Sequence, residues 1–266
     1  MDQRITCVYS RRPESWEQHF HNTHELVYVQ SGAARFTIGN EVYEAGPHTL
    51  IFISKSEMHS TAVTAEPYCR WWVRVTAEQL TAAAEDGRLR AVWERRPSRF
   101  CHAFDVGPIA GEVEGYLAAL AAEKPEDPFA RQKCEALLGL LLIAVWRLRP
   151  EQFPLPARGV DLTAERIQRY IDGHFSEELR VGDLARQFGL SDSYLTHSFR
   201  RWAGVSPQGY ILLCRLSLAR ELLLTGDLPV AEVAARCGFG DVSNFIRLFR
   251  THTGCTPAAY RKRGGI

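Results

Sequence analysis

Histidine and acidic side chains in the first part of the chain have a spacing that could bind a ligand. His19 and His21 stand at alternate positions, and Glu25 follows four residues after the second histidine. His59 lies further along the chain. Alternation along a strand would place the two histidines on one face. Imidazole and carboxylate groups can bind a transition metal or hydrogen-bond a polar molecule.

Arg35 adds a guanidinium, a forked donor suited to a carboxylate or to hydroxyl groups. We therefore predict that four side chains bind a small polar ligand: His21, Glu25, Arg35 and His59. Two alternatives stay open, namely that the histidines and Glu25 bind a metal ion, or that the histidines are purely structural. We assign no cofactor and no metal at this stage.

Short runs of β-branched and aromatic residues between residues 16 and 75 would position these groups. The expected strands, two of which end at the turn signals Ser31-Gly32 and Gly39-Asn40, are Glu25–Gln30, Ala34–Ile38, Thr49–Ile53 and Tyr68–Val75. Closely spaced short strands are typical of a small sandwich or barrel.

Helical periodicity follows from about Pro108. Ile109–Ala122 and Phe129–Arg149 have apolar residues at helical spacing, with a break at residues 124–128. The second helix has an apolar stripe wider than one intramolecular partner should need: Leu137, Leu138, Leu141, Leu142 and Val145. We predict that these paired helices form a dimer interface.

Three prolines and a glycine fall between Pro150 and Gly159, too many for a helix, so residues 150–160 are predicted to be a domain linker. Residues 1–160 carry 18 basic and 20 acidic groups, net −2, and residues 161–266 carry 14 and 11, net +3. This difference is too small to indicate nucleic-acid binding on its own.

Composition excludes several classes of protein. The seven cysteines are scattered and form no CxxC, which argues against a zinc finger and against a disulfide framework. The first 14 residues lack the apolar core of a signal peptide, and the run Ala136–Trp146 is about half the length that crosses a bilayer. We expect a cytoplasmic protein without a membrane segment.

The C-terminal part repeats itself at a period of 49–50 residues. Val181–Leu190 matches Val230–Phe239, and Ser191–Tyr210 matches Asp241–Tyr260 at an offset of 50. In this second match the residues are identical at six pairs of positions: Ser193/Ser243, Phe199/Phe249, Arg200/Arg250, Gly204/Gly254, Pro207/Pro257 and Tyr210/Tyr260.

Each copy has the parts of a helix-turn-helix. In the first copy Ala185 permits close helix crossing, and Gly189 can adopt the positive φ of a tight turn. Leu195 and Phe199 form an i,i+4 apolar stripe on the second helix. A helical bundle or a solenoid fragment could use the same stripe, but a solenoid needs more than two copies and neither fold would explain the arginines on the opposite face.

That opposite face is polar and partly basic in both copies, as expected for DNA contacts. Its side chains are Ser193, Thr196, His197, Arg200 and Arg201 in the first copy, and Ser243, Asn244, Arg247 and Arg250 in the second. Between the copies, Ser206-Pro207 supplies an N-cap and a first-turn proline. A helix from there to Thr225 would be about 30 Å long, close to the roughly 34 Å between successive major grooves.

Residues 165–263 resemble the DNA-binding domain of the AraC family of bacterial regulators. The resemblance is most specific in the second copy, from Gly238-Phe-Gly-Asp through Pro257-Ala-Ala-Tyr260-Arg261. It implies a homodimer, binding to promoter DNA and contact with RNA polymerase. It also implies base contacts at Ser193, Thr196, His197, Asn244, Ile246 and Arg247, with Arg200 and Arg250 nearer the phosphates. Ile246 departs from the polar residue expected there and could read only a thymine methyl group.

The N-terminal part resembles a cupin. His19, His21 and Glu25, followed by Gly32, resemble the first cupin motif, and His59 after Gly46 resembles the second. The resemblance implies the regulatory β-barrel that many AraC-like proteins carry, and in metal-binding cupins such residues converge on one ion.

We therefore predict an α+β protein, with an N-terminal cupin-like β-barrel and helical pair followed by an all-α domain of two helix-turn-helix units joined by a long helix. The expected divisions are a sensing barrel (1–107), a helical dimerisation segment (108–149), a linker (150–160) and an AraC-type DNA-binding domain (161–266).

The predicted function is sequence-specific DNA-binding transcriptional regulation, as an activator responding to a small polar metabolite such as a sugar, and not catalysis. The expected partners are promoter DNA, a small-molecule effector, RNA polymerase and a second copy of the chain. Two other classes stay open: a metal-dependent cupin enzyme fused to a DNA-binding module, and a constitutive architectural DNA binder.

Overall fold

The computed structural model describes residues 5–13, 15–21, 23–39, 41–55, 57–94, 96, 100–124, 126–154, 162–203 and 205–262. The chain forms two units, the first of residues 1–18 and 23–158 and the second of residues 19–22 and 159–266. Of the predicted linker at 150–160, residues 155–160 lie outside the described residues. Its first residues form a 3-10 turn, η2 (Pro150–Gln152), and Phe153 packs in the core of the first unit.

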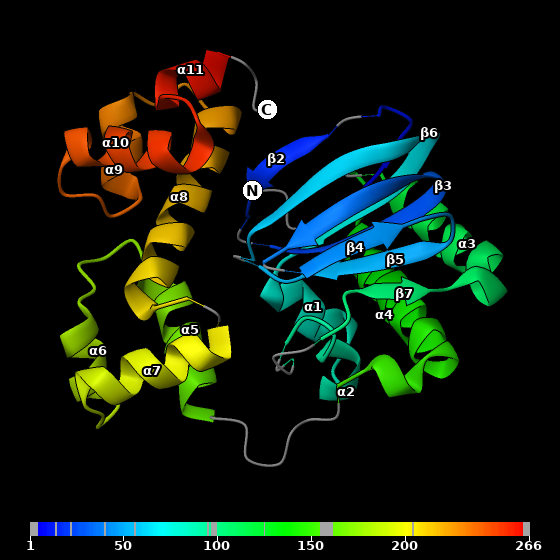
Figure 1. The fold of residues 1–266 in the computed structure, drawn as a ribbon, viewed down its shortest axis with the longest axis horizontal. Coiled ribbons are helices and arrows are strands. Elements are labelled where there is room, and N and C mark those ends of the chain that lie inside the picture. The colour runs from blue at the N-terminus through cyan, green and yellow to red at the C-terminus, as the bar shows by residue number, and fades with distance from the viewer. Residues whose placement is uncertain are drawn as a thin grey trace. The chain divides into compact units, whose positions relative to one another are not determined.

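The first unit contains an antiparallel sheet with strand order β1-β6-β3-β5-β7, in which β2 also pairs with β6 and β4 with β3 (Figure 1). The strands are β1 (Thr6–Ser10), β2 (Trp16–His19), β3 (His24–Ile38), β4 (Glu41–Ala45), β5 (Thr49–Ile53), β6 (His59–Val75) and β7 (Ala103–Asp105). An antiparallel sheet can bury apolar side chains on one face when helices cover that face.

The prediction of a turn at Ser31-Gly32 was wrong. The two short strands expected around it are one strand, β3, whose register against β6 shifts between Val29 and Ala34. Gly32 has φ +71°, and a Cβ there would lie 2.5 Å from the carbonyl oxygen of Ala65 on β6. Only glycine fits a bulge packed this closely, so β3 bends there and continues. Gly39, with φ +58°, follows the end of β3.

Side chains alternate between the two faces of the sheet. Val27 and Val29 on β3 belong to an apolar cluster with Phe36 and Tyr68. Leu26 and Tyr28, on the other face of β3, belong to a larger cluster that includes side chains of the helices. Those helices are α1 (Ala77–Ala83), α2 (Gly87–Arg90), α3 (Ala110–Ala121), which follows the 3-10 turn η1 (Gly107–Ile109), and α4 (Ala130–Leu148).

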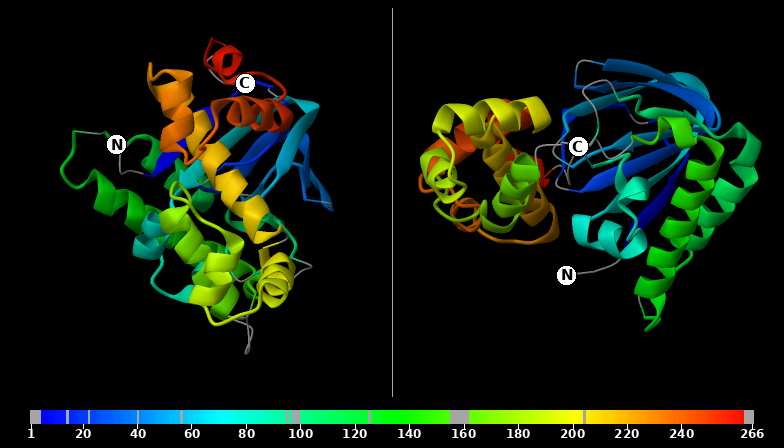
Figure 2. Two further views of the ribbon diagram at one scale, coloured as in Figure 1. Left: turned by 90° about the vertical axis from the view of Figure 1, so that its left-hand side faces the viewer. Right: turned by 90° about the horizontal axis from the view of Figure 1, so that it is seen from below.

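Figure 2 shows α3 and α4 side by side along one face of this sheet. Leu138, Leu141, Leu142 and Val145 of α4 are fully buried in the large cluster of this unit, and Leu137 packs against it. The expected stripe is therefore filled by the chain's own core, so its width is no argument for a dimer. The apolar side chains that α4 and the residue before it expose are Leu140 and Phe129, at 47% and 67%.

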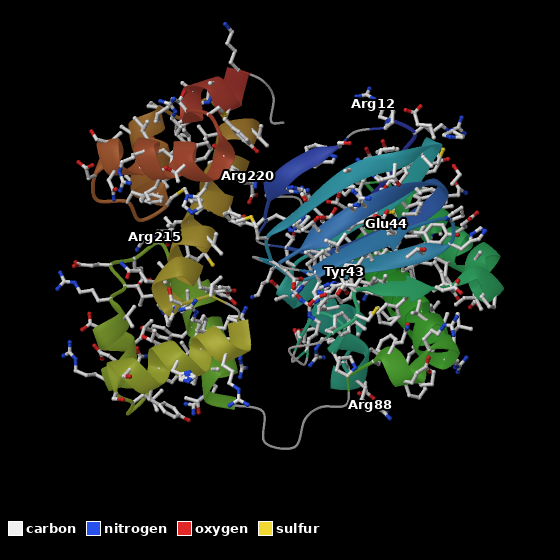
Figure 3. The ribbon with its side chains drawn as sticks, viewed as in Figure 1. Arg12, Tyr43, Glu44, Arg88, Arg215 and Arg220 are labelled. Atoms are coloured by element: carbon white, nitrogen blue, oxygen red, sulfur yellow. The ribbon has the colours of Figure 1, made fainter. Side chains whose placement is uncertain are left out.

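Residues 162–203 and 205–262 of the second unit form helices and the short segments that join them. Its helices are α5 (Leu162–His174), α6 (Val181–Gln187), α7 (Asp192–Ala203), α8 (Pro207–Thr225), α9 (Val230–Arg236), α10 (Val242–Thr253) and α11 (Pro257–Lys262). As expected, Ser206 caps α8, its Oγ accepting a hydrogen bond from the Gly209 backbone N–H at 3.1 Å. Arg215 of α8, labelled in Figure 3, donates to the carbonyl oxygens of Phe175 and Glu177 and so ties α8 to the segment after α5.

The two copies of the repeat fold alike. Leu195 and Phe199 of α7 are fully buried, as are Phe245 and Phe249 at the matching positions of α10. Gly189 and Gly238 both have positive φ, at +66° and +82°. A Cβ on Gly238 would lie 2.5 Å from the Ser176 carbonyl oxygen. The glycines therefore have the turn conformation that the sequence predicts.

Candidate functional site

The helix α7 presents its predicted DNA-contacting side chains on one face. Ser193, His197, Arg200 and Arg201 are exposed, and Thr196 is half-buried. A shallow depression on this surface is lined by Asp192, Ser193, Thr196, His197 and Arg200. The opposite face of the helix holds the buried Leu195 and Phe199. An amphipathic helix of this kind is fixed by its apolar side and leaves its polar side available to a partner.

The helix α10 repeats this arrangement. Ser243, Asn244, Arg247 and Arg250 are exposed and Ile246 is half-buried, so burial follows the same order along α10 as along α7. The carboxylate of Asp241 caps the helix by accepting from the Asn244 backbone N–H at 2.5 Å. The side-chain oxygen of Asn244 in turn accepts a hydrogen bond from Nη2 of Arg247 at 2.7 Å.

Tyr194 is a surface residue of α7 that the sequence reasoning missed. Its side chain is 55% exposed, although an aromatic ring next to Leu195 suggests a core position. At the offset of 50 residues, Tyr194 matches Asn244, which was assigned to the polar face of the second copy. This match could have identified Tyr194 as a surface residue.

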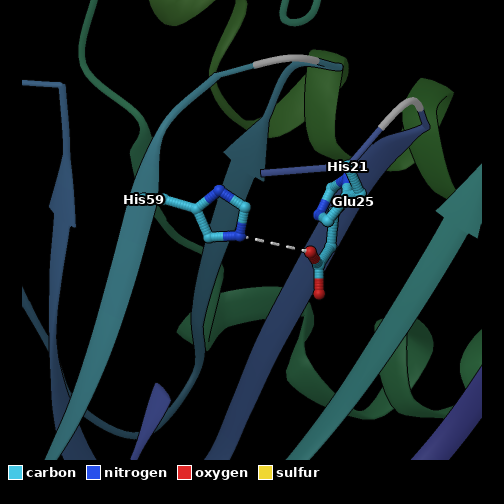
Figure 4. Close-up of side chains that lie close together, drawn as sticks. All are labelled: His21, Glu25 and His59. Atoms are coloured by element: carbon cyan, nitrogen blue, oxygen red, sulfur yellow. Dashed lines mark ion pairs between the residues drawn. The ribbon is translucent and has the colours of Figure 1, made fainter. Parts of the chain in front are cut away.

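In the first unit, Glu25 at the start of β3 and His59 at the start of β6 face each other (Figure 4). The distance between His59 Nε2 and Glu25 Oε2 is 3.7 Å, and their side chains are only 3% and 10% exposed. The Nδ1 atom of His59 lies 2.8 Å from the backbone oxygen of Glu57. His21 is also buried, and it belongs to the second unit.

The structure does not bring Arg35 or His19 into this group. Arg35 is 54% exposed on β3, and its Nε lies 2.5 Å from Glu44 of β4, a residue labelled in Figure 3. Strand alternation explains this position, since Arg35 lies between the buried Ala34 and Phe36. The ring of His19 is half-buried, with its centroid 6.2 Å from that of His21.

Arg70 is the buried arginine that the sequence reasoning missed. It is 6% exposed on β6, and its guanidinium carbon lies 5.4 Å from the ring centroid of Tyr68. The hydroxyl oxygen of Tyr68 is buried and has no hydrogen-bond partner among the residues described. Burial raises the pKa of Tyr68 against the opposing charge of Arg70, and the nearby carboxylate of Glu25 raises it further.

A second polar cluster lies beside His59. Arg96 Nη2 donates to Glu57 Oε2 at 2.7 Å, and His102 Nε2 lies 3.7 Å from Glu57 Oε1. Burial alone would raise the pKa of Glu57, but the charges of Arg96 and His102 lower it on balance. Burial and the charge of Arg96 lower the pKa of His102. Glu57 lies 39 residues before Arg96, and the three residues form no motif, so no pattern could have predicted the cluster.

Residues 5–142 match the family of the AraC-like ligand binding domain, and residues 184–263 match a helix-turn-helix domain family. The first match spans more than half of the 266 residues. The chain belongs to the AraC family of transcriptional regulators. It is therefore a sequence-specific DNA-binding regulator with a ligand-binding domain, as the repeat and the barrel motifs predicted.

Two curated members of the family align over most of the chain. The "HTH-type transcriptional regulator YdiP" of Escherichia coli, described as uncharacterized, is 25% identical over 93% of this chain and 82% of its own length. The "HTH-type transcriptional activator RhaS" of Klebsiella pneumoniae is 26% identical over 96% of this chain and 91% of its own length. Both are named as regulators of transcription rather than as enzymes.

The fold also resembles a solved structure. ToxT from Vibrio cholerae superposes with a TM-score of 0.68 over 97% of each chain, at 14% identity. At this identity the likeness shows the fold alone, and it agrees with the α+β architecture that the sequence predicted. Among the residues described, no helix has both the length and the apolar character needed to cross a bilayer.

Proposed function

We propose that this AraC-family chain is an activator that binds promoter DNA as a homodimer and changes its DNA affinity when a small polar effector binds its sensor domain. The name of the aligned activator from Klebsiella pneumoniae supports the sign of regulation. Promoter DNA and RNA polymerase are in the bacterial cytoplasm, and we propose that the chain acts there.

The observation that carries the DNA-binding part is the matched exposure of α7 and α10. Each buries an aromatic or aliphatic stripe and exposes polar and basic side chains at the same positions. The connecting helix α8 has 19 residues, which at 1.5 Å per residue is about 28 Å. This is near the roughly 34 Å repeat of successive major grooves. We propose that the two helices enter adjacent grooves on one face of the duplex.

Individual roles follow from side-chain chemistry. On α10, Arg247 suits a bidentate contact with a guanine, and Asn244 suits an adenine. Ile246 is half-buried and could contact a thymine methyl group. Arg200, Arg201 and Arg250 lie toward the ends of their helices, where we propose phosphate contacts. The remaining proposed DNA contacts are Ser193, Thr196, His197 and Ser243.

For the effector we propose contacts from His21, Glu25 and His59. We propose Arg70 in place of Arg35 as the guanidinium of the site, because Arg70 is buried with Tyr68 on β6 while Arg35 pairs with Glu44 at the surface. A buried hydroxyl and guanidinium suit a ligand that carries hydroxyl or carboxylate oxygens.

The dimer proposal rests on the family and on the exposed side chains of α4. Leu140 and Phe129 are apolar and exposed, and an exposed apolar surface of this kind can be covered by a second copy.

The test is selection of bound sequences from a random DNA pool with purified full-length protein, followed by affinity measurement on the selected site. Two specific half-regions about one helical turn apart are expected. Binding without any sequence preference would contradict the proposal and would favour an architectural DNA binder.

A further inference from the structure

We infer that the ring of Tyr194 on α7 contacts a thymine methyl group in the major groove, and that Tyr194 thereby determines one base of the DNA sequence that the chain prefers. Tyr194 can have this role only if α7 enters the major groove, so the inference rests on the proposed function. It adds to that function a base preference in the first copy of the repeat, for which the second copy supplies a matched comparison.

Tyr194 lies in the first turn of α7. Its backbone N–H donates to Oγ of Ser191 at 3.2 Å, and the Leu195 backbone N–H donates to the Ser191 carbonyl oxygen at 3.0 Å. Ser191 therefore caps the helix, which begins at Asp192. In a helix-turn-helix the N-terminal residues of the recognition helix contact the base edges. Tyr194 is thus at the end of α7 where base contacts are expected.

The side chain of Tyr194 also shares a side of the helix with two of the proposed DNA contacts. His197 and Arg201 follow it by three and seven positions, and all three residues are exposed. Residues at this spacing lie on the same side of a helix. Tyr194 is 55% exposed, whereas the next residue, Leu195, is fully buried. Leu195 holds α7 against the core, so the ring of Tyr194 is left to contact a partner on the side that carries His197.

The position of Tyr194 in α7 is held by Asn244 in α10, at the offset of 50 residues, and both side chains are exposed. The side-chain oxygen of Asn244 accepts from Arg247, one turn later on the same face, at 2.7 Å. An amide can bond to N6 and N7 of adenine at once, whereas an aromatic ring offers apolar contact to the C5 methyl group of thymine. We therefore expect thymine opposite Tyr194 and adenine opposite Asn244.

A tyrosine side chain suits such a contact. It has only two side-chain torsions, so the ring loses little conformational entropy when it is fixed against DNA. The hydroxyl group at its tip can hydrogen-bond with water or with a phosphate oxygen. Removing one methyl group from a contact of this kind should weaken binding by about 4-fold. An effect of this size is measured best by changing the methyl group itself.

The test uses the full-length protein and the DNA site selected from the random pool. Each thymine of the site is replaced in turn by uracil, which lacks only the C5 methyl group, and affinity is measured by fluorescence anisotropy. The wild-type chain should lose about 4-fold in affinity at one thymine of the region bound by α7. Tyr194→Ala should bind the unmodified site about 4-fold more weakly, and it should bind the thymine and uracil forms of that position equally well.

Two further variants separate the ring from the hydroxyl group and test the comparison with α10. Tyr194→Phe should distinguish thymine from uracil as the wild type does. Tyr194→Asn should shift the preference at that base pair toward adenine. Leu224→Ala is the matched control, since it shortens an apolar side chain of α8 that is 45% exposed, and it should bind as the wild type does. Circular dichroism identifies any variant that fails to fold, and the uracil series on the wild-type chain needs no variant.

Equal affinity of the wild type for thymine and uracil at every position would overturn the role of Tyr194. The same conclusion would follow if Tyr194→Ala distinguished the two bases wherever the wild type does, and the ring would then be assigned to a protein partner. If Arg247→Ala still relaxed its own base pair, the proposed DNA binding would hold and only the role of Tyr194 would be lost. A wild-type chain without any sequence preference would overturn both.

Discussion

Arg247 of α10 donates a hydrogen bond from Nη2 to Oδ1 of Asn244, one turn earlier on the same exposed face, at 2.7 Å. The bond holds the guanidinium along the helix surface before any DNA is present. A side chain fixed in this way loses less rotamer entropy when it binds a base than a freely rotating one does. Asn244 thus has two possible roles, as a base contact and as a support for Arg247.

Replacing Arg247 by alanine should lower specific DNA affinity by about 1–3 kcal/mol and relax the preference at one base pair, since a bidentate base contact is lost. Fluorescence anisotropy on the selected site and on its single-base variants measures both effects. Arg236→Ala is a suitable control because Arg236 is exposed on α9 and pairs with Glu232. An unchanged base preference at every position would contradict the base-reading role.

Replacing Arg200 by alanine should weaken binding to all sequences alike, because a phosphate contact carries no sequence information. The slope of log affinity against log salt concentration should fall by about one unit. Anisotropy titrations at several salt concentrations measure the slope. A slope equal to that of the wild type would show that Arg200 contacts no phosphate.

The fragment 161–266 should bind the same DNA sequence as the full-length chain, more weakly and without an effector response. The fragment retains α7 and α10 and its own apolar core, but loses the sensor domain and any avidity from dimerisation. Parallel titrations of fragment and full-length protein, with and without effector, give the comparison. An effector response in the fragment would place the ligand site in the DNA-binding half.

Leu140→Glu should shift the sensor domain toward the monomer, because it places a charge in the exposed apolar surface proposed as the dimer interface. Sedimentation of residues 1–154 at micromolar concentration measures the effect. Gln132→Glu, an exposed change on the same helix, is the control. If the wild-type fragment is already a monomer, the interface must lie elsewhere.

The thiol of Cys237 should resist alkylation at pH 8.5 while that of Cys101 reacts. Burial raises the pKa of Cys237 to about 12, against the opposing charge of Arg215, and the thiolate is the reactive form. Cys101 is exposed. The raised pKa also means that the unfolded chain ionises Cys237 first, so its contribution to stability is lost as pH rises above the ordinary thiol range. Iodoacetamide labelling followed by mass spectrometry checks the order of reaction, and equal rates would contradict it.

The helical half of the fold could be predicted because its signals are local. The offset between the two copies aligns glycine with glycine and phenylalanine with phenylalanine, and the cap at Ser206 fixes where α8 begins. The helix-turn-helix stripe needs only residues four apart, a spacing that the helix itself imposes. For the same reason the start and end of α3 and α4 fell within one residue of expectation.

The sensor site was harder to predict because its parts come together through strand pairing. His21 and Glu25 are close in sequence, so a local motif singles them out as candidates, but Arg70 is brought beside β3 only through the pairing of β6 with β3. The guanidinium of Arg35 is suited to a polar ligand, but its side chain lies on the exposed face of β3. Strand alternation alone could not show which face Arg35 occupies, because the bulge at Gly32 was unknown. The contacts of Arg96 and His102 with Glu57 depend on the path of the chain between the strands, which no hydrophobic periodicity predicts.

The bend at Gly32 has a practical consequence for engineering this protein. A glycine after a serine, bounded by two apolar runs, is where one would insert a tag, a reporter domain or new chain ends. Here that position interrupts a backbone shared with β4, β5 and β6. An insertion would separate the half of β3 that carries Glu25 from the half that pairs with β4. A tag or fusion for following this protein in cells should therefore be placed elsewhere, with the exposed residues near Glu126 as a better choice.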